Sequence, residues 1–540
     1  MEKRALIAVL LSLGVWILWF YLFPPQEKTP PVPEKSAETA TVQTEEIQKP
    51  EISVVSKFQQ TFTKKEEVTI DAKYYTAVLS NEDGQCTSFI DKVRNIELIV
   101  TKSKFDAKGF FDFPVHFSTG EFLHAKDIPP ALWKMQKDAS AVRFSTVAIV
   151  QKNPLEISKK FTYNETGQYF VVSYAITNKG QSEFTFPEGG VIFSPSDFLG
   201  PSMDFDNSYN ELHGIYYIND SFEKARKGGG FFSAPEDLKR ENGVVQWAGI
   251  MSRYYLLIMI PQGFAGSGVV YDNREHTGFR TGIMVPVKPL KPGETITHEF
   301  KVYVGPKNKD KLLAVDKHIG DAADVSKWIE PIRDFMMWCL LEINRLIGNL
   351  GWSLVIFSVI TKIMFLPLTQ RSTESMKKMQ ELNPVIQELR EKYKDKPDVL
   401  NKKIMEVYKK NKVNPMGGCL PLLLQMPFFF ALYSALINSV DLWQAPFILW
   451  IKDLSLPDTI YRIAGFNINI LPLVMTGTTY LQQKMSSSEV TQQQKMLMLM
   501  PLIFIVIFWN MPSGLVLYWI MQNVLQIGHQ MLINKIGKKK

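Results

Sequence analysis

The 540-residue sequence predicts a polytopic α-helical membrane protein with a large all-β sandwich domain. Long uncharged segments gather near the two ends of the chain, whereas the middle is polar and alternates in the manner of β-strands. Lysine and arginine are concentrated in the segments that a count of the spans places in the cytoplasm, as the positive-inside rule expects. Together these observations predict six transmembrane helices with both termini in the cytoplasm, and a β domain outside it.

Residues 1–23 are predicted to form an N-terminal transmembrane anchor. A basic start precedes an uncharged run over residues 5–23, which at about 1.5 Å per residue is long enough to cross the hydrocarbon core. A cleavable signal peptide is the alternative, but its apolar region is usually shorter and ends in small residues. Here the run ends in bulky side chains up to Phe23, so we expect no cleavage.

Six prolines among polar residues make residues 24–55 a linker.

Residues 56–320 are predicted to form the β domain. Runs such as 141–150, 254–260 and 295–304 are rich in β-branched and aromatic residues, and clusters of Gly, Pro and Asn separate them. No long helical periodicity interrupts these runs, which favours a sandwich. Because the domain follows an anchor whose start is cytoplasmic, it is expected on the other side of the membrane.

Residues 325–348 are predicted to form an amphipathic interfacial helix. Apolar residues recur there at helical spacing, from Trp328 to Leu346, and charged residues lie between them. Such a helix suits the surface of a membrane. Packing against the β domain is the alternative.

Residues 350–540 are predicted to form a core of five membrane helices. The apolar segments cover residues 350–368, 421–440, 466–481, 496–509 and 514–533. The loop 369–415 between the first two is net basic and has the pattern of a helical hairpin, with a turn near Lys396 and Pro397. Its lysines suit anionic lipid headgroups, a ribosome or another acidic partner, although a simply solvated face explains them equally well.

Motifs of covalent catalysis and of cofactor binding are missing from the sequence. It contains no P-loop pattern and no H-E-x-x-H metal motif. The cysteines Cys86, Cys339 and Cys419 are too scattered for a disulfide framework or a zinc site. We therefore expect no enzyme, no cofactor and no metal, and the net charge of +7 does not indicate a general nucleic-acid binder.

Lys362 lies within the segment 350–368. A lysine at the centre of a bilayer costs roughly 2.5–3.5 kcal/mol on translocon scales, so it usually faces a polar cavity or a partner. Snorkelling towards the headgroups is the alternative. Ser358 lies one turn before Lys362, and no acidic residue is present in any predicted span. The other spans contribute hydroxyls and amides: Gln425, Ser434, Thr476, Thr478, Thr479, Gln522 and Asn523. These residues predict a hydrated groove.

Three motifs in the last third of the chain resemble one family. They are Asn414-Pro415-Met416-Gly417-Gly418-Cys419-Leu420-Pro421, Gln425-Met426-Pro427-Phe428-Phe429 and Pro512-Ser513-Gly514-Leu515-Val516-Leu517-Tyr518-Trp519. They closely resemble the YidC-type membrane protein insertases of the YidC/Oxa/Alb family, and the β domain matches the architecture of the Gram-negative form with its large periplasmic domain. The resemblance places the family's groove cation at Lys362, where most relatives carry arginine, next to the groove position that the spacing gives to Ser358. It places substrate-contacting positions at Gln425, Met426, Pro427, Tyr518 and Trp519. Trp519 stands where the family often has tyrosine.

The resemblance implies an insertase and chaperone that inserts and helps fold integral membrane proteins of the bacterial inner membrane. Insertion would use a hydrated intramembrane groove without nucleotide hydrolysis, alone or with the Sec translocon of SecYEG and SecDF. Residues 24–349 would be largely periplasmic, and the hairpin 369–415 and the C-terminus cytoplasmic. Implied partners are nascent membrane proteins, anionic lipids and a ribosome bound by the basic hairpin and C-terminal tail, with no other nucleic acid. A solute transporter using Lys362 as an anion site and a sugar-binding or epimerase role of the β domain remain as alternatives.

Overall fold

The computed structural model describes residues 57–58, 64–99, 109–111, 131–163, 169–186, 190–201, 212–225, 238–272, 280–323, 329–394, 396–411, 413, 420–463, 466–486 and 500–537. The predicted anchor 1–23 and the predicted linker 24–55 lie outside the described residues. So do the first six residues of the Asn414 motif and the basic tail 538–540.

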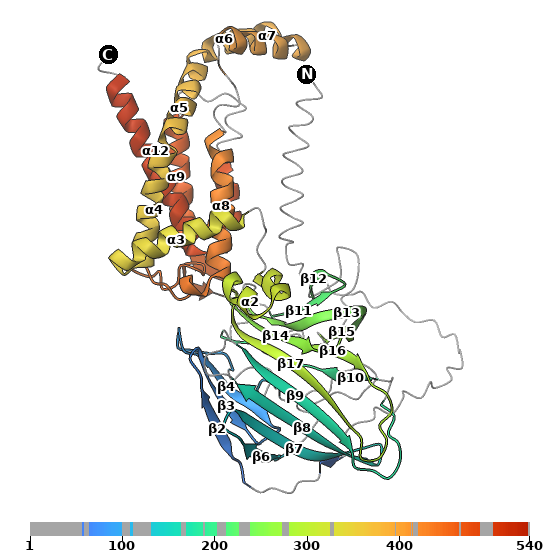
Figure 1. Ribbon diagram of the computed structural model, residues 1–540. Coiled ribbons are helices and arrows are strands. Elements are labelled where there is room, and N and C mark those ends of the chain that lie inside the picture. The colour runs from blue at the N-terminus through green and yellow to red at the C-terminus, as the bar shows by residue number, and fades with distance from the viewer. Residues whose placement is uncertain are drawn as a thin grey trace, which may run out of the picture. The chain divides into compact units, whose positions relative to one another are not determined.

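The first part of the described chain is rich in strands (Figure 1). The strands are β1 (Lys57–Phe58), β2 (Glu67–Asp71), β3 (Tyr75–Ser80), β4 (Gln85–Asp91), β5 (Ile96–Glu97), β6 (Lys134–Lys137), β7 (Ala141–Val150), β8 (Asn153–Tyr163), β9 (Tyr169–Asn178), β10 (Gly190–Phe193), β11 (His213–Ile218), β12 (Ser221–Lys224), β13 (Leu238–Met251), β14 (Tyr255–Gln262), β15 (Gly266–Asp272), β16 (Arg280–Pro286) and β17 (Thr295–Pro306). The short helices α2 (Lys309–Val315) and η4 (Lys317–Ala323) follow. The β-rich character predicted for this region is confirmed.

The strands form two antiparallel sheets around one core. The larger sheet has the order β1-β7-β8-β9-β17-β14-β13-β15-β16-β10, to which β6, β11 and β12 are attached, and β2-β3-β4-β5 form the smaller sheet. Strands β8 and β9 alternate between buried and half-buried side chains, as a strand with one core face requires. Residues of both sheets, including Phe89 and Phe161, belong to one buried apolar cluster.

Helices make up most of the remaining chain. They are α3 (Glu330–Ile347), α4 (Leu350–Met364), α5 (Leu366–Glu381), α6 (Asn383–Lys392), α7 (Pro397–Lys410), α8 (Leu420–Asn438), the short η6 (Val440–Leu442), α9 (Leu471–Ser486), α11 (Met500–Phe508) and α12 (Ser513–Gly537). Strands β18 (Thr459–Ile463) and β19 (Phe466–Asn469) form a hairpin between η6 and α9. By length and hydropathy, none of the helices in the described residues is long and apolar enough to cross a membrane.

Two of the predicted apolar segments differ from the observed elements. Segment 350–368 is divided at Phe365 into α4 and α5, because Pro367 has no N–H to donate and its ring crowds the carbonyl one turn earlier. In segment 466–481, the first residues pair with β18 as strand β19, and α9 begins only at Leu471. Proline is favourable at position 472, because the backbone N–H groups of the first helical turn have no acceptor within the helix and none is lost.

Helix α3 is amphipathic and contacts both α4 and α8. Its buried residues are Met336 and Leu340, whereas Phe335 and Trp338 are exposed. The helix ends at Ile347 because Gly348 adopts a left-handed conformation with φ of 72°. Asn349 then caps α4 by accepting a hydrogen bond from the Trp352 N–H at 3.0 Å.

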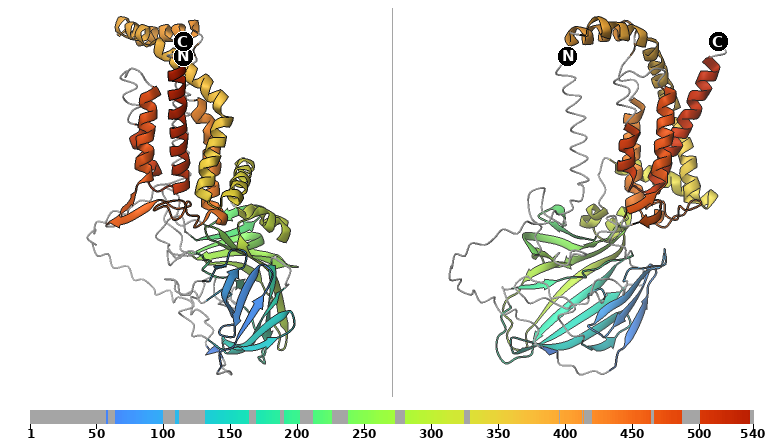
Figure 2. Two further views of the ribbon diagram at one scale, coloured as in Figure 1. Left: turned by 90° about the vertical axis from the view of Figure 1, so that its left-hand side faces the viewer. Right: turned by 180° about the vertical axis from the view of Figure 1, so that it is seen from behind.

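Helix α12 lies between α4 and α9 and contacts both of them (Figure 2). It also contacts α8, and α11 packs against α9. Several of the polar residues that the sequence singled out, including Lys362, Gln522 and Asn523, lie at these helix contacts.

Candidate functional site

Helix α4 presents three polar side chains on one face. Ser358, Thr361 and Lys362 are three and four residues apart, and this spacing places them on one side of a helix. The Ser358 hydroxyl donates to the carbonyl oxygen of Leu354 at 2.7 Å, and the Thr361 hydroxyl donates to the carbonyl oxygen of Ser358 at 3.0 Å. All three residues are buried, so their polar atoms need partners inside the protein.

Helix α12 supplies the facing side chains. Tyr518, Gln522 and Gln526 are four residues apart and therefore form one stripe along the helix. The Gln522 side-chain amide donates to the Ser358 carbonyl oxygen and to the Thr361 hydroxyl, both at 3.1 Å. The contact between α4 and α12 is therefore hydrogen-bonded as well as packed.

The Lys362 ammonium contacts the amide of Gln526. Its Nζ donates to Gln526 Oε1 at 2.6 Å, and the lysine is only 7% exposed. Within the described residues, no acidic side chain forms an ion pair with Lys362. A hydrogen bond from a charged donor is shorter and stronger than a neutral one, and an amide oxygen accepts it without cancelling the charge. The positive charge is thus both buried and retained.

Helix α8 adds Gln425, whose Nε2 lies 3.5 Å from Gln522 Oε1, at the limit of a hydrogen bond. Met426 and Pro427 follow it, and all three side chains are half-buried. Pro427 stands inside α8 and removes one backbone donor from that helix. Gln425 therefore brings α8 to the edge of the polar contact between α4 and α12.

Other faces of α12 make different contacts. Trp519 packs in an aromatic cluster with Phe429 of α8 and with Phe504 and Phe508 of α11, at ring-centroid distances of 5.7, 5.8 and 5.4 Å. The Asn523 side-chain amide donates to the hydroxyls of Thr478 at 3.2 Å and Thr479 at 2.8 Å, both in α9. Helix α12 is therefore the element that joins the others.

The structure places the seven residues singled out from the sequence as follows. Ser358, Lys362 and Gln425 are brought together through the glutamines of α12. Tyr518 is buried on the same stripe of α12, whereas Trp519 is half-buried in the aromatic cluster next to it. Met426 and Pro427 adjoin Gln425 on α8.

Sequence reasoning missed two residues of this site, Thr361 and Gln526. The spacing of Tyr518, Gln522 and Gln526 is a signal that points to Gln526, because it defines a polar stripe on an otherwise apolar helix. Thr361 adjoins Lys362, but an intrahelical hydroxyl is common and carries little information by itself.

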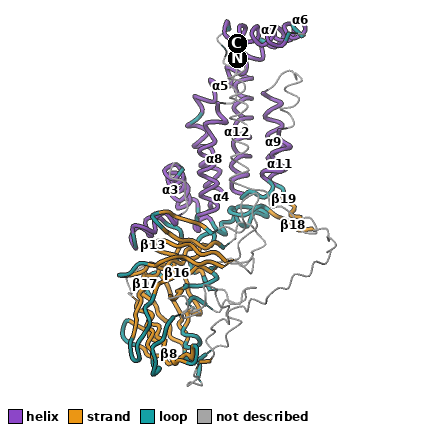
Figure 3. Tube along the Cα trace, turned by 90° about the vertical axis from the view of Figure 1, so that its right-hand side faces the viewer, coloured by secondary structure: helices purple, strands orange, loops and turns teal. Residues whose placement is uncertain are grey.

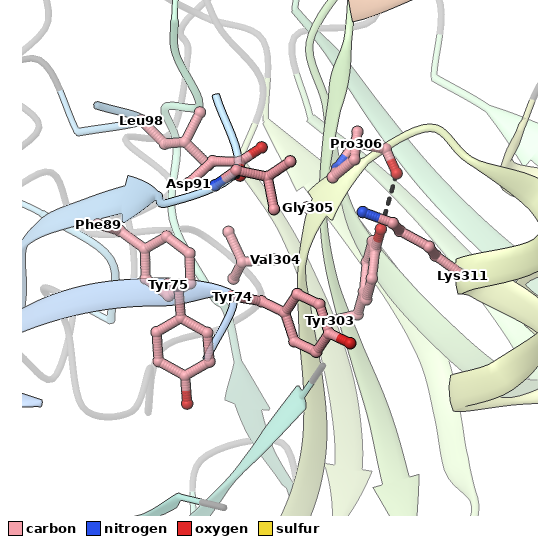
Figure 4. A pocket seen from close by; sticks show the side chains of 11 residues that line it. Tyr74, Tyr75, Phe89, Asp91, Leu98, Tyr303, Val304, Gly305, Pro306 and Lys311 are labelled. Carbon is pink, nitrogen blue, oxygen red and sulfur yellow. Dashed lines mark hydrogen bonds between the residues drawn. The ribbon is translucent and has the colours of Figure 1, made fainter. Parts of the chain in front are cut away.

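The β domain contains a small pocket between its two sheets (Figure 4). Tyr75, Phe89 and Asp91 line it from the smaller sheet, and Tyr303 and Pro306 from β17. Its volume is about 30 Å³, which is room for about one water molecule and far below the several hundred Å³ of a typical ligand pocket. This pocket does not fit a sugar ring.

Comparisons with known proteins cover both parts of the chain. The family model described as 60Kd inner membrane protein matches residues 342–540, and the one described as YidC periplasmic domain matches residues 124–339. The Membrane protein insertase YidC of Pelobacter propionicus is 33% identical over 99% of this chain and 99% of its own length. That of Leptospira interrogans serovar Lai is 31% identical over 99% of this chain and 98% of its own length. A crystal structure of an active YidC insertase with its first transmembrane domain resolved is similar at 18% identity, with a TM-score of 0.37, and covers 98% of this chain and 99% of that one.

Proposed function

The chain belongs to the YidC family of membrane protein insertases, as the sequence motifs predicted, and on this premise we propose how its helices support insertion. Its function is membrane protein insertion, and nascent membrane proteins are its substrates. We propose that the contact between α4, α8 and α12 is where the exported end of a substrate enters. The reaction involves no covalent chemistry and no nucleotide hydrolysis.

The observation that carries this proposal is the buried Lys362 ammonium whose partner is an amide. An ammonium has three donors, and Gln526 accepts from one of them. The remaining donors can meet a carboxylate in the exported tail of a substrate. Two unit charges 4 Å apart attract by about 4 kcal/mol at an effective dielectric constant of 20. This is the order of the electrostatic stabilisation that Lys362 offers to an acidic tail.

We propose that insertion proceeds by exchange of polar partners. The tail enters from the cytoplasmic side, and the amides of Gln425 and Gln522 turn from one another to the tail and to the water that enters with it, while Gln526 keeps its bond to Lys362. The apolar part of the substrate then passes between α8 and α12 into the lipid. Burial of apolar surface at roughly 25 cal/mol per Å² supplies the driving force.

The membrane setting belongs to the same proposal. We propose six spans in the bacterial inner membrane with both termini in the cytoplasm, residues 1–23 as anchor, residues 24–349 largely periplasmic and residues 350–540 as the insertase core. Helices α5, α6 and α7 then lie in the cytoplasmic loop. Exposed basic residues in the last turns of α6 and α7, such as Lys392 and Lys410, support contacts with anionic lipids or a ribosome. Cooperation with the Sec translocon is part of the proposal by family membership alone.

Substitutions of Lys362 test the proposal in proteoliposomes that contain the purified full-length protein. The assay compares two substrates that differ only in the exported tail, one acidic and one neutral. We expect Lys362→Ala to lower insertion of the acidic tail by about tenfold or more, because about 1.4 kcal/mol of lost stabilisation is tenfold. Lys362→Arg should keep function because the charge stays, and Lys362→Glu should be the most defective with acidic tails.

Two controls complete the test. Lys403→Ala removes a lysine that is exposed on α7 and paired with Glu406 at 2.8 Å, and it should leave the ratio of acidic to neutral insertion unchanged. A cysteine in place of the half-buried Gln425 should react with a membrane-impermeant thiol reagent from the cytoplasmic side only. If Lys362→Ala lowered insertion of both substrates equally and the cysteine at 425 did not react, the proposal of a hydrated groove would be wrong.

A further inference from the structure

The hairpin of β18 and β19 exposes an unusual amount of apolar surface. All five residues of β18 are exposed, including Ile460, Tyr461 at 64% and Ile463 at 55%. Soluble protein rarely leaves adjacent apolar side chains of a strand open to water on both of its faces. This feature has no part in the site built by α4, α8 and α12.

The hairpin is nevertheless firmly held at its base. The Asp458 carboxylate accepts hydrogen bonds from the backbone N–H groups of Ile470 at 2.9 Å and Leu471 at 2.8 Å, where α9 begins. The Asn469 side-chain amide donates to the carbonyl oxygen of Trp509, and the Trp509 indole donates to the carbonyl oxygen of Asn467 at 2.9 Å. An isolated two-stranded hairpin is marginally stable, so these contacts fix its direction relative to the ends of α9 and α11.

The two helices next to the hairpin expose apolar side chains as well; β18, β19, α9 and α11 lie near one another in the trace (Figure 3). Leu473 and Val474 are exposed in the first turn of α9, and Val506 is exposed in the last turn of α11. Arg462 lies between Tyr461 and Ile463 on the exposed strand β18, so an aromatic and a long cationic side chain accompany the apolar residues. Aromatic residues and long cationic side chains are the residue types that occupy the boundary between lipid tails and headgroups.

We propose that the β18–β19 hairpin is an interfacial anchor that lies in the headgroup region of the extracytoplasmic leaflet. Tyr461 and Ile463 contact lipid about 5–10 Å into the boundary between headgroups and acyl chains, and Arg462 contacts lipid phosphate. The occupant of this surface is lipid, because the hairpin is bonded to the start of α9, and both α9 and α11 expose apolar side chains in an insertase core. This inference rests on the membrane setting given in the proposed function. Its consequence is that the ends of α9 and α11 are held at a defined depth.

Fluorescence at single cysteines tests the anchor in the full-length protein, with the three native cysteines replaced by alanine. An environment-sensitive probe is attached at Ile463→Cys, and the protein is reconstituted in phosphatidylglycerol–phosphatidylethanolamine vesicles that carry nitroxide-labelled lipids. Val244→Cys is the matched control, because Val244 is 56% exposed on strand β13 of the β domain. Val506→Cys reports whether α11 lies in lipid at all.

We expect the probe at 463 to emit at shorter wavelength than the probe at 244, and to be quenched most by nitroxides near the headgroups. The probe at 506 should be quenched most by nitroxides deeper in the acyl region. An aqueous spectrum at 463 together with a lipid-quenched probe at 506 overturns the anchor and leaves the membrane setting intact; the surface would then belong to a protein partner. Aqueous spectra at both positions overturn the membrane setting itself.

Discussion

Replacing Gln526 by leucine removes the acceptor of the Lys362 ammonium while nearly keeping the volume of the side chain. The 2.6 Å contact between Lys362 Nζ and Gln526 Oε1 is lost, and the ammonium has no other side-chain partner in the described residues. A lysine in that position leaves the contact with α12 and extends along α4 towards the cytoplasmic headgroups. We therefore predict that Gln526 is a positioning residue, whose substitution changes insertion only through Lys362.

The size of the effect follows from the type of hydrogen bond that is lost. Hydrogen bonds to charged groups contribute roughly 1.5–3 kcal/mol, and an unsatisfied buried charge is costlier than an unsatisfied neutral group. If this stabilisation keeps the ammonium at the entry site, its loss lowers insertion of acidic tails by roughly 10–150-fold. Neutral tails make no use of the charge, so their insertion should change little.

The assay is the proteoliposome insertion experiment with matched acidic and neutral tails. Gln526→Leu should lower the ratio of acidic to neutral insertion, and adding it to Lys362→Ala should have no further effect on that ratio, because the two residues act as one unit. Gln526→Glu should lower the ratio by another route: the lysine stays in place, but its charge is cancelled and the new carboxylate repels the tail.

Asn523→Leu is the matched control on the same helix, one turn before Gln526. It removes an amide that binds Thr478 and Thr479 of α9 and not Lys362. It should lower insertion of both substrates alike or not at all. If Gln526→Leu behaves like Asn523→Leu, or if it lowers the ratio equally with and without Lys362, then Gln526 has only a packing role and the reasoning fails.

Two further predictions concern the β domain. Lys159→Met should lower the free energy of unfolding by roughly 3 kcal/mol or more. The buried Lys159 ammonium donates to three backbone carbonyls, those of Asp83, Gly84 and Phe111, at 2.6–3.1 Å, and methionine cannot replace these bonds. Urea unfolding monitored by tryptophan fluorescence measures the change, and a value below about 1 kcal/mol would contradict the prediction. Burial lowers the pKa of His298, so the unfolded chain binds the proton more readily than the folded domain. The domain should therefore lose stability as the pH falls below about 6.5. We expect faster proteolysis at pH 5.5 than at pH 7.5 and no such difference in His298→Gln; an unchanged pH dependence in that variant would contradict the prediction.

The fold was predictable where local pattern and tertiary environment agree. The alternation of buried and half-buried residues in β8 and β9 follows the sequence because each strand has one face on the core. Residues 466–470 were assigned to an apolar span, although apolar and asparagine residues alternate there with the period of a strand. Short apolar runs do not distinguish helix from strand, and the pairing of β19 with β18 decides between them.

The site was predictable only in part, for a physical reason. Lys362 was found because an unpaired charge in an apolar segment is costly wherever the segment packs. Gln526 was not found, because its contact with Lys362 depends on how α4 and α12 are aligned along their axes, and no local pattern specifies that alignment. The resemblance to a family supplied Tyr518 and Trp519 as neighbours in sequence, whereas the structure separates them into a buried stripe and an aromatic cluster.

The pairing with Gln526 can be compared with the number of donors that a lysine and an arginine would bring to this position. One of the three ammonium donors is used by the Gln526 oxygen, and the two that remain equal the number of oxygens in a single carboxylate. A guanidinium has five donors in a rigid plane, so an arginine that kept the bond to Gln526 would leave four donors; one carboxylate can accept two of them side by side, and the other two would need water or further amides. With lysine, the amides of Gln522 and Gln526 and one substrate carboxylate are enough to satisfy the polar groups at this end of the contact. The three donors of Lys362 can therefore be matched by Gln526 and the carboxylate of one substrate tail.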